Sequence, residues 1–126
     1  MDKTARYRTG LFLAPMVRIG TLTTRLIALE NGAALVWGPE IVDKAMIGAN
    51  RVEDAGGVIR YEKAPGSAIW ETHPIEKNRL IYQLGSSDPA LAVEAAKTVA
   101  RDVSAFGCRP LLRRTQAAST STCASR

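Results

Sequence analysis

The pattern of apolar and polar residues predicts two successive units of strand, loop and helix. Residues 11–15 (Leu-Phe-Leu-Ala-Pro) form a continuous apolar run, which is typical of a strand buried on both faces. Thr21 predicts the start of a helix whose leucines recur on one side and which ends at Asn31-Gly32. Residues 33–37 (Ala-Ala-Leu-Val-Trp) then predict the next strand.

The second unit begins with a strand over residues 80–84. Asp88-Pro89 supplies a capping side chain and a proline at the first helical position, so a helix is expected to follow. Residues 104–106 predict the start of another strand. Strands that alternate with helices indicate an α/β fold with a parallel sheet.

Two shorter elements are expected between these units. Residues 40–47 predict a short helix after Gly38-Pro39. The apolar stretches 58–61 and 68–71 flank a turn-rich segment, Ala-Pro-Gly-Ser, which predicts an inserted hairpin.

Length and charge limit what this sheet can become. A chain of 126 residues makes at most one domain, and its 46% apolar content is sufficient for a globular core. The formal net charge is +5, but residues 107–126 contain four arginines and no acid, so the first 106 residues are nearly neutral. Because residues 116–125 show no period and no large apolar side chain, we expect segment 107–126 to be disordered or foreign to the fold.

The two cysteines, Cys108 and Cys123, both lie in this last segment, where a disulfide would close only a polar tail. A reducing, cytoplasmic setting is therefore expected. The first apolar run is short and interrupted by Pro15, which predicts neither a secretion signal nor a membrane span.

Gln83 is the main candidate for ligand binding. It lies at the end of an apolar strand, immediately before a turn and a capped helix, where α/β proteins commonly handle their ligands. Glu40 follows another strand and either reaches the same site or simply favours a helix start. His73, the single histidine, is expected to be a solvated loop residue, and no metal site is predicted.

Three segments in order resemble one known family. They are Leu-Ala-Pro-Met-Val-Arg-Ile-Gly-Thr-Leu at 13–22, Lys-Ala-Met-Ile at 44–47 and Asn-Arg-Leu-Ile-Tyr-Gln-Leu-Gly at 78–85. Together they resemble the N-terminal part of a tRNA-dihydrouridine synthase, most of all the eukaryotic type that modifies the D-loop of cytosolic tRNA. The resemblance covers residues 11–106.

The resemblance implies a TIM (β/α)8 barrel that holds FMN and acts on tRNA. In this family the reduced flavin gives a hydride to uridine, and NADPH restores the flavin. Pro15, Met16 and Val17 match the family's loop against the flavin, and Gln83 matches the amide that contacts the flavin ring. An amide suits that contact because it offers both a donor and an acceptor.

The chain departs from the family pattern after Phe106. The family has an acid and an asparagine that lead into Gly-Cys-Pro, whose cysteine is the proton donor, whereas here Gly107-Cys108-Arg109-Pro110 follows at once. Cys108 is either that cysteine after a short deletion or a coincidence, and we favour coincidence. The catalytic residues therefore stay unassigned.

Such a barrel takes about 250 residues, so we expect a partial barrel of about the first three to four strands, in a truncated chain with little or no activity. Two alternatives stay open. One is a non-catalytic fragment whose open strand edges associate with another chain or aggregate. The other is a different FMN-dependent barrel oxidoreductase.

Overall fold

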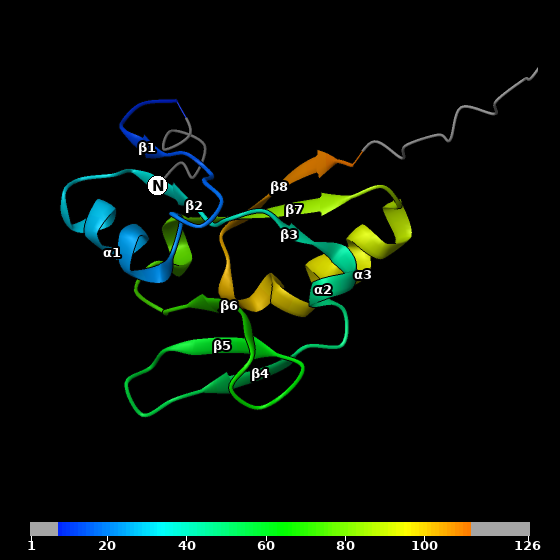
Figure 1. Ribbon diagram of the computed structural model, residues 1–126. Helices are drawn as coiled ribbons and strands as arrows, with labels where there is room; N and C mark the ends of the chain where they lie inside the picture. Colours follow the sequence, from blue (N-terminus) through cyan, green and yellow to red (C-terminus); the bar gives the residue numbers. More distant parts are fainter. Residues whose placement is uncertain (1–7, 112–126) are drawn as a thin grey trace, which may run out of the picture.

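A parallel sheet organises residues 8–111, which are the residues that the computed structural model describes (Figure 1). All of its strand pairs are parallel, as the two predicted strand-helix units require. Its strands are β1 (Phe12–Leu13), β2 (Leu35–Trp37), β3 (Ile41–Val42), β7 (Leu80–Ser86) and β8 (Ala105–Pro110). The central strand is β7, which contacts β2, β3 and β8.

Strands β2 and β3 lie along the same edge of β7 and are two parts of one interrupted strand. Trp37 lies opposite Ile81, and Ile41 lies opposite Leu84, so the β2–β3 side contains one residue more than β7 between these pairs. The Gly38 N–H still donates to the Ile81 carbonyl oxygen at 3.0 Å. This arrangement is a bulge, and it leaves four rows in chain order: β1, β2 with β3, β7 and β8.

The helices are α1 (Leu22–Glu30), α2 (Asp43–Met46), α3 (Pro89–Val99) and the 3-10 turns η2 (Lys77–Arg79) and η3 (Ala100–Asp102). Helices α1 and α3 begin where their capping residues predict. The Thr21 side chain caps α1, and Gly32 follows its end with a φ of +91°. Asp88 caps α3 with Pro89 at its first position. No helix in the described range is long and apolar enough to cross a bilayer.

The sheet has two unlike faces. Leu80, Tyr82 and Leu84 point to the face that we call the core face, where they pack with residues of α1 and α3. Because successive side chains of a strand alternate, Ile81 and Gln83 point to the opposite face, which we call the site face. Figure 1 shows α2, α3 and a second sheet on one side of the parallel strands.

The second sheet is antiparallel and is inserted between α2 and β7. It consists of β4 (Asn50–Glu53), β5 (Ile59–Glu62) and β6 (Ala68–Thr72). Its aromatic residues attach it to the core face, because the Trp70 ring lies 5.6 Å from the Tyr61 ring and 4.9 Å from the Tyr82 ring, centroid to centroid. The hairpin predicted over 58–71 is thus confirmed, with β4 as an additional strand.

A buried carboxylate joins the insertion to the end of α3. Asp102 accepts hydrogen bonds from the Arg51 Nε, at 2.8 Å, and from the Tyr61 hydroxyl. Burial alone would raise the pKa of Asp102, but these hydrogen bonds outweigh it and hold the pKa below its ordinary value. The same contacts link β4 and β5 to η3.

An ion pair between Arg25 and Glu76 fixes α1 against the insertion. Both side chains are almost fully buried, and Arg25 binds the carboxylate through Nε at 2.8 Å and Nη2 at 2.7 Å. Arg25 also donates to the carbonyl oxygens of Gly20 and Glu71, and Thr72 donates to Glu76. Two buried charges are tolerated here because each is surrounded by hydrogen-bond partners.

Three expectations from the sequence need correction. The strand at 11–15 is only two residues long and lies at an edge, with Leu11 76% exposed, so it is not buried on both faces. The helix predicted over 40–47 begins only at Asp43, because residues 41–42 pair with β7 first. Strand β8 continues to Pro110, beyond the boundary expected at 106, and residues 112–126 lie outside the described range.

The sheet does not close into a barrel within residues 8–111. β1 pairs only with β2, and β8 pairs only with β7, so both outer strands have one edge without a partner in this range. The partial barrel expected from the resemblance is thus supported only as an α/β fold with a parallel sheet.

Replacing Arg25 tests the buried ion pair. Arg25→Met leaves the Glu76 carboxylate buried without its cation, so we expect the free energy of unfolding to fall by about 3–5 kcal/mol. Arg60→Met, at a half-exposed arginine paired with Asp54 and Glu71, should lower it far less, because water screens that pair. Urea unfolding followed by circular dichroism measures both. Equal losses in the two variants would contradict the role given to Arg25.

The lowered pKa of Asp102 predicts a pH dependence of stability. The ionised Asp102 carboxylate stabilises the folded protein fully above the pKa of the unfolded chain, which is about 3.9. This stabilisation is lost as the pH falls through the lower pKa of the folded protein. In Asp102→Asn this contribution is missing, so the stability gap between wild type and variant should shrink as pH falls below about 4. Urea unfolding at pH 6, 4 and 3 measures it. A gap that widens toward acid pH would be inconsistent with the assignment.

Candidate functional site

Gln83 and Gly107 form the centre of the site face. They lie opposite each other on β7 and β8, and Gln83 is half-buried. A Cβ atom at position 107 would come within 2.6 Å of the Gln83 Oε1, which real side chains do not tolerate. Because Gly107 has no side chain, the Gln83 amide can lie directly above it.

Aromatic rings border the Gln83 amide. The Trp37 Nε1 lies 3.4 Å from the position of the same absent Cβ, so the indole and the amide meet above Gly107. Phe12 stacks edge-on against Trp37, with ring centroids 6.1 Å apart. The floor beside Gln83 is thus flat and largely apolar.

A carboxylate and an arginine lie further along the same face. The Glu40 side chain covers Gly85, where a Cβ atom would approach its Oε1 to 3.0 Å. Arg109 Nη1 donates to Glu40 Oε2 at 3.3 Å from an exposed position on β8. Glu40 therefore belongs to the site face, and the alternative that it starts a helix is wrong because α2 begins at Asp43.

The loop after β1 holds the other three candidates. Pro15 and Val17 are exposed, and Met16 is half-buried. The loop closes through a hydrogen bond from the Gly20 N–H to the Met16 carbonyl oxygen at 2.9 Å, and Arg18 takes a positive φ of 67°. The register of the parallel strands puts this loop and Gln83 toward the carboxyl ends of the strands, with β2 and β3 between them.

Cys108 does not face this site. It pairs with Leu84, whose side chain belongs to the core face, so the free and exposed thiol points away from Gln83. His73 is not a freely solvated residue either. Its Nδ1 accepts a hydrogen bond from the Ile75 N–H at 3.2 Å, and its ring packs on Gly57. Within residues 8–111 no cluster of metal-binding side chains occurs.

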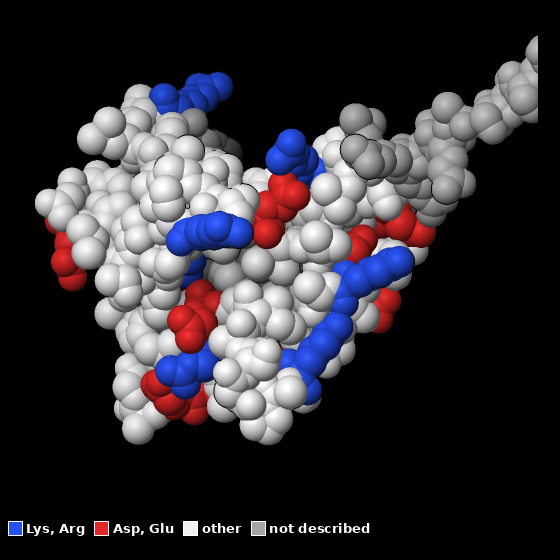
Figure 2. Space-filling model, viewed as in Figure 1, with Lys and Arg blue, Asp and Glu red and all other residues white. Residues whose placement is uncertain are grey.

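Charged side chains of both signs lie side by side over part of the face that Figure 2 shows, and a band of Lys and Arg side chains crosses its lower right. Arg60, for example, contacts both Asp54 and Glu71.

The site face suits a flat ring with a polar rim. Trp37 and Phe12 offer apolar surface, and the Gln83 amide, which lies over Gly107, offers a donor and an acceptor. The chemistry of these residues fits the flavin that the resemblance implies. Trp37 and Gly107 were not foreseen, because their proximity to Gln83 depends on strand register, which the local sequence does not show.

Comparison with known proteins gives the chain its relatives. No protein-family model matches it. The tRNA-dihydrouridine(20) synthase [NAD(P)+] of Schizosaccharomyces pombe is 55% identical over 102 residues, which are 77% of this chain and 21% of that protein. The enzyme of the same name from Saccharomyces cerevisiae is 45% identical over 106 residues, which are 78% of this chain and 28% of that protein.

The chain thus spans between about a fifth and somewhat more than a quarter of the length of these relatives. Identity at this level over most of the chain reflects common descent, and it confirms the resemblance found in the sequence. The chain is homologous to one part of the tRNA-dihydrouridine(20) synthases.

Proposed function

We propose that residues 11–106 form the N-terminal part of the FMN-binding barrel of a cytoplasmic tRNA-dihydrouridine synthase. The flavin, reduced by NADPH, supplies the hydride that converts uridine to dihydrouridine in tRNA. In this proposal Gln83 holds the polar rim of the flavin, and Pro15, Met16 and Val17 line it from the loop after β1. The proton donor is not assigned, since Cys108 points to the other face.

One observation carries this proposal. The Gln83 amide lies on the site face directly above Gly107, toward the carboxyl ends of the strands, where the loop after β1 also lies. The residues that match the family's flavin contacts thus come from two separate segments and lie toward the same end of the sheet. The 55% identity to the Schizosaccharomyces pombe enzyme favours this reading over another FMN-dependent oxidoreductase.

A second candidate function is association with another chain. It is favoured by the edges of β1 and β8, which lack partners among the described residues. A strand from a second molecule can pair with such an edge. Residues that complete the sheet would then also complete the flavin site.

A chimera tests the proposed function directly. Residues 11–106 replace the homologous segment of the Schizosaccharomyces pombe enzyme, in a yeast strain that lacks its own enzyme. We expect dihydrouridine at position 20 of tRNA, measured by mass spectrometry of tRNA digests, because the segment supplies its part of the flavin site. A folded, abundant chimera without dihydrouridine would rule the proposal out.

Two variants of the chimera separate binding from folding. Gln83→Leu removes the amide at similar size, so the FMN absorbance per protein at limiting flavin should fall, with affinity reduced about tenfold for a lost ligand hydrogen bond. Asn31→Leu is the matched control, since it removes an exposed amide that caps α1. Similar flavin losses in both would remove support for Gln83 as a flavin contact.

The 126-residue chain by itself should bind FMN weakly and leave uridine in tRNA unchanged. The reason is that an open parallel sheet exposes two strand edges and the site face to water. Flavin absorbance after gel filtration and tRNA digests give the measurement, and light scattering reports association through the edges. Tight, stoichiometric FMN with turnover by monomers would overturn this expectation.

A further inference from the structure

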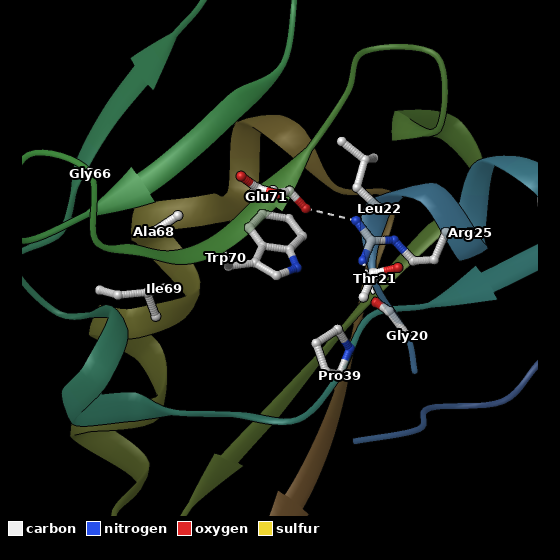
Figure 3. Close-up of a pocket in the computed structure, with 10 residues that line it drawn as sticks. All are labelled: Gly20, Thr21, Leu22, Arg25, Pro39, Gly66, Ala68, Ile69, Trp70 and Glu71. Carbon is white, nitrogen blue, oxygen red and sulfur yellow. Dashed lines mark hydrogen bonds between the residues drawn. The ribbon is translucent and has the colours of Figure 1, made fainter. Parts of the chain in front are cut away.

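The lysines of the chain differ from its arginines in what they contact. Every ion pair between residues 8 and 111 has an arginine as its cation. Figure 3 shows one of these arginines, Arg25, directed inward to the Glu71 carbonyl oxygen. The lysines of this range are exposed and pair with no acid within it: Lys44, Lys63, Lys77 and Lys97. The arginines therefore stabilise the fold, whereas the lysine charges face solvent.

Two of these lysines, Lys44 and Lys63, contact each other, and we call them the lysine pair. The Lys63 Nζ donates to the Lys44 carbonyl oxygen at 2.7 Å. Lys44 lies in α2 and Lys63 follows β5, so this bond joins the antiparallel insertion to α2. Figure 2 shows a band of Lys and Arg side chains where Figure 1, in the same view, places α2 and the insertion. Because the carbonyl is neutral, the bond fixes the Lys63 ammonium without cancelling its charge.

The acids next to the lysine pair in the sequence do not neutralise it. Asp43 is buried and accepts a hydrogen bond from the Ser86 hydroxyl. The Glu62 Oε2 accepts from the Gly66 N–H at 3.2 Å, in the turn of the hairpin. Neither carboxylate forms an ion pair with Lys44 or Lys63. Two ammonium groups on one surface repel each other, and an anion that binds both relieves the repulsion.

The position of the lysine pair indicates where such an anion comes from. Helix α2 begins at Asp43, directly after β3, and so lies at the carboxyl ends of the parallel strands. Gln83 and the loop after β1 lie toward the same end. An RNA strand that delivers a uridine to this end carries a phosphate on each side of that nucleotide. The lysine pair therefore lies next to the course of a negatively charged backbone.

We propose that Lys44 and Lys63 form a contact surface for the phosphate backbone of tRNA. The proposal rests on the proposed function and adds to it a surface over which the substrate runs. Since the Lys44 carbonyl oxygen already holds the Lys63 side chain, little further freedom is lost when a phosphate binds. Contacts to phosphate position an RNA without reading its bases, so this surface supplies affinity and orientation.

The salt dependence of RNA binding tests the lysine pair. Fluorescence anisotropy of the 126-residue chain with unmodified tRNA, from about 50 to about 200 mM salt, gives the slope of log K against log salt. Lys44→Gln and Lys63→Gln should each reduce the magnitude of this slope by about 0.7–0.9, because each removes one phosphate contact. Lys77→Gln is the matched control. It also removes one exposed lysine, but Lys77 precedes β7 at the amino end of the sheet, so the slope should stay unchanged. Equal reductions in all three variants would refute the surface.

Two further measurements separate charge from structure and RNA from other polyanions. Lys63→Arg keeps the charge and should keep the slope, whereas a reduction as large as that of Lys63→Gln would contradict an electrostatic role. An oligouridylate should displace the tRNA at lower concentration than polyglutamate of the same charge, and equal displacement would overturn the choice of RNA as the partner.

Failure of this proposal is distinguishable from failure of the proposed function, since its readout needs neither flavin nor turnover. Unchanged slopes beside a chimera that forms dihydrouridine would refute the lysine contact alone. Reduced slopes beside a folded, inactive chimera would support the lysine contact and count against the proposed function.

Discussion

A parallel sheet needs both of its faces covered and its edge strands protected from pairing with other chains, and this requirement shapes the whole molecule. Residues 8–111 meet it on one face. The helices and the antiparallel insertion cover the core face, and the buried Arg25–Glu76 pair fixes α1 to the insertion. The site face and the edges of β1 and β8 are where the described residues leave the requirement unmet, and the residues expected to bind flavin belong to this part.

The division between the faces also separates two kinds of polar chemistry. On the core side the buried charges of Arg25, Glu76 and Asp102 are each held by several partners, so they fix structure. On the site side Gln83 is placed by the absence of a neighbouring side chain at Gly107. An amide whose position depends on the lack of a neighbouring side chain keeps its N–H and C=O groups for a ligand. A carboxylate that already accepts several hydrogen bonds does not.

The sequence predicted those elements whose signals are local. Thr21 and the Asp88-Pro89 pair mark helix starts through their own backbone contacts, and the strand at 80–84 is a continuous apolar run. The two-residue strand β3 and the polar strand β4 carry no such signal and were missed, because only pairing with distant strands defines them.

The candidate site was predictable to the same extent. Gln83 could be found from its place at a strand end and from the family resemblance. Its neighbours Trp37 and Gly107 come from other strands, and only the register of three strands brings them together. Residue 107 was expected to lie outside the fold, yet it continues β8 opposite Gln83.

The bulge between β2 and β3 has a consequence for tolerance to insertions and deletions. The extra residue reverses the in-out alternation after Trp37, which turns Ile41 toward the hydrophobic core and leaves Glu40 above Gly85. Shortening the segment 38–40 by one residue would remove the bulge and still leave Ile41 opposite Leu84, so Ile41 would keep its place in the core and Asp43 its contact with Ser86. The segment can therefore lose one residue without a change in the register of the strand that follows it.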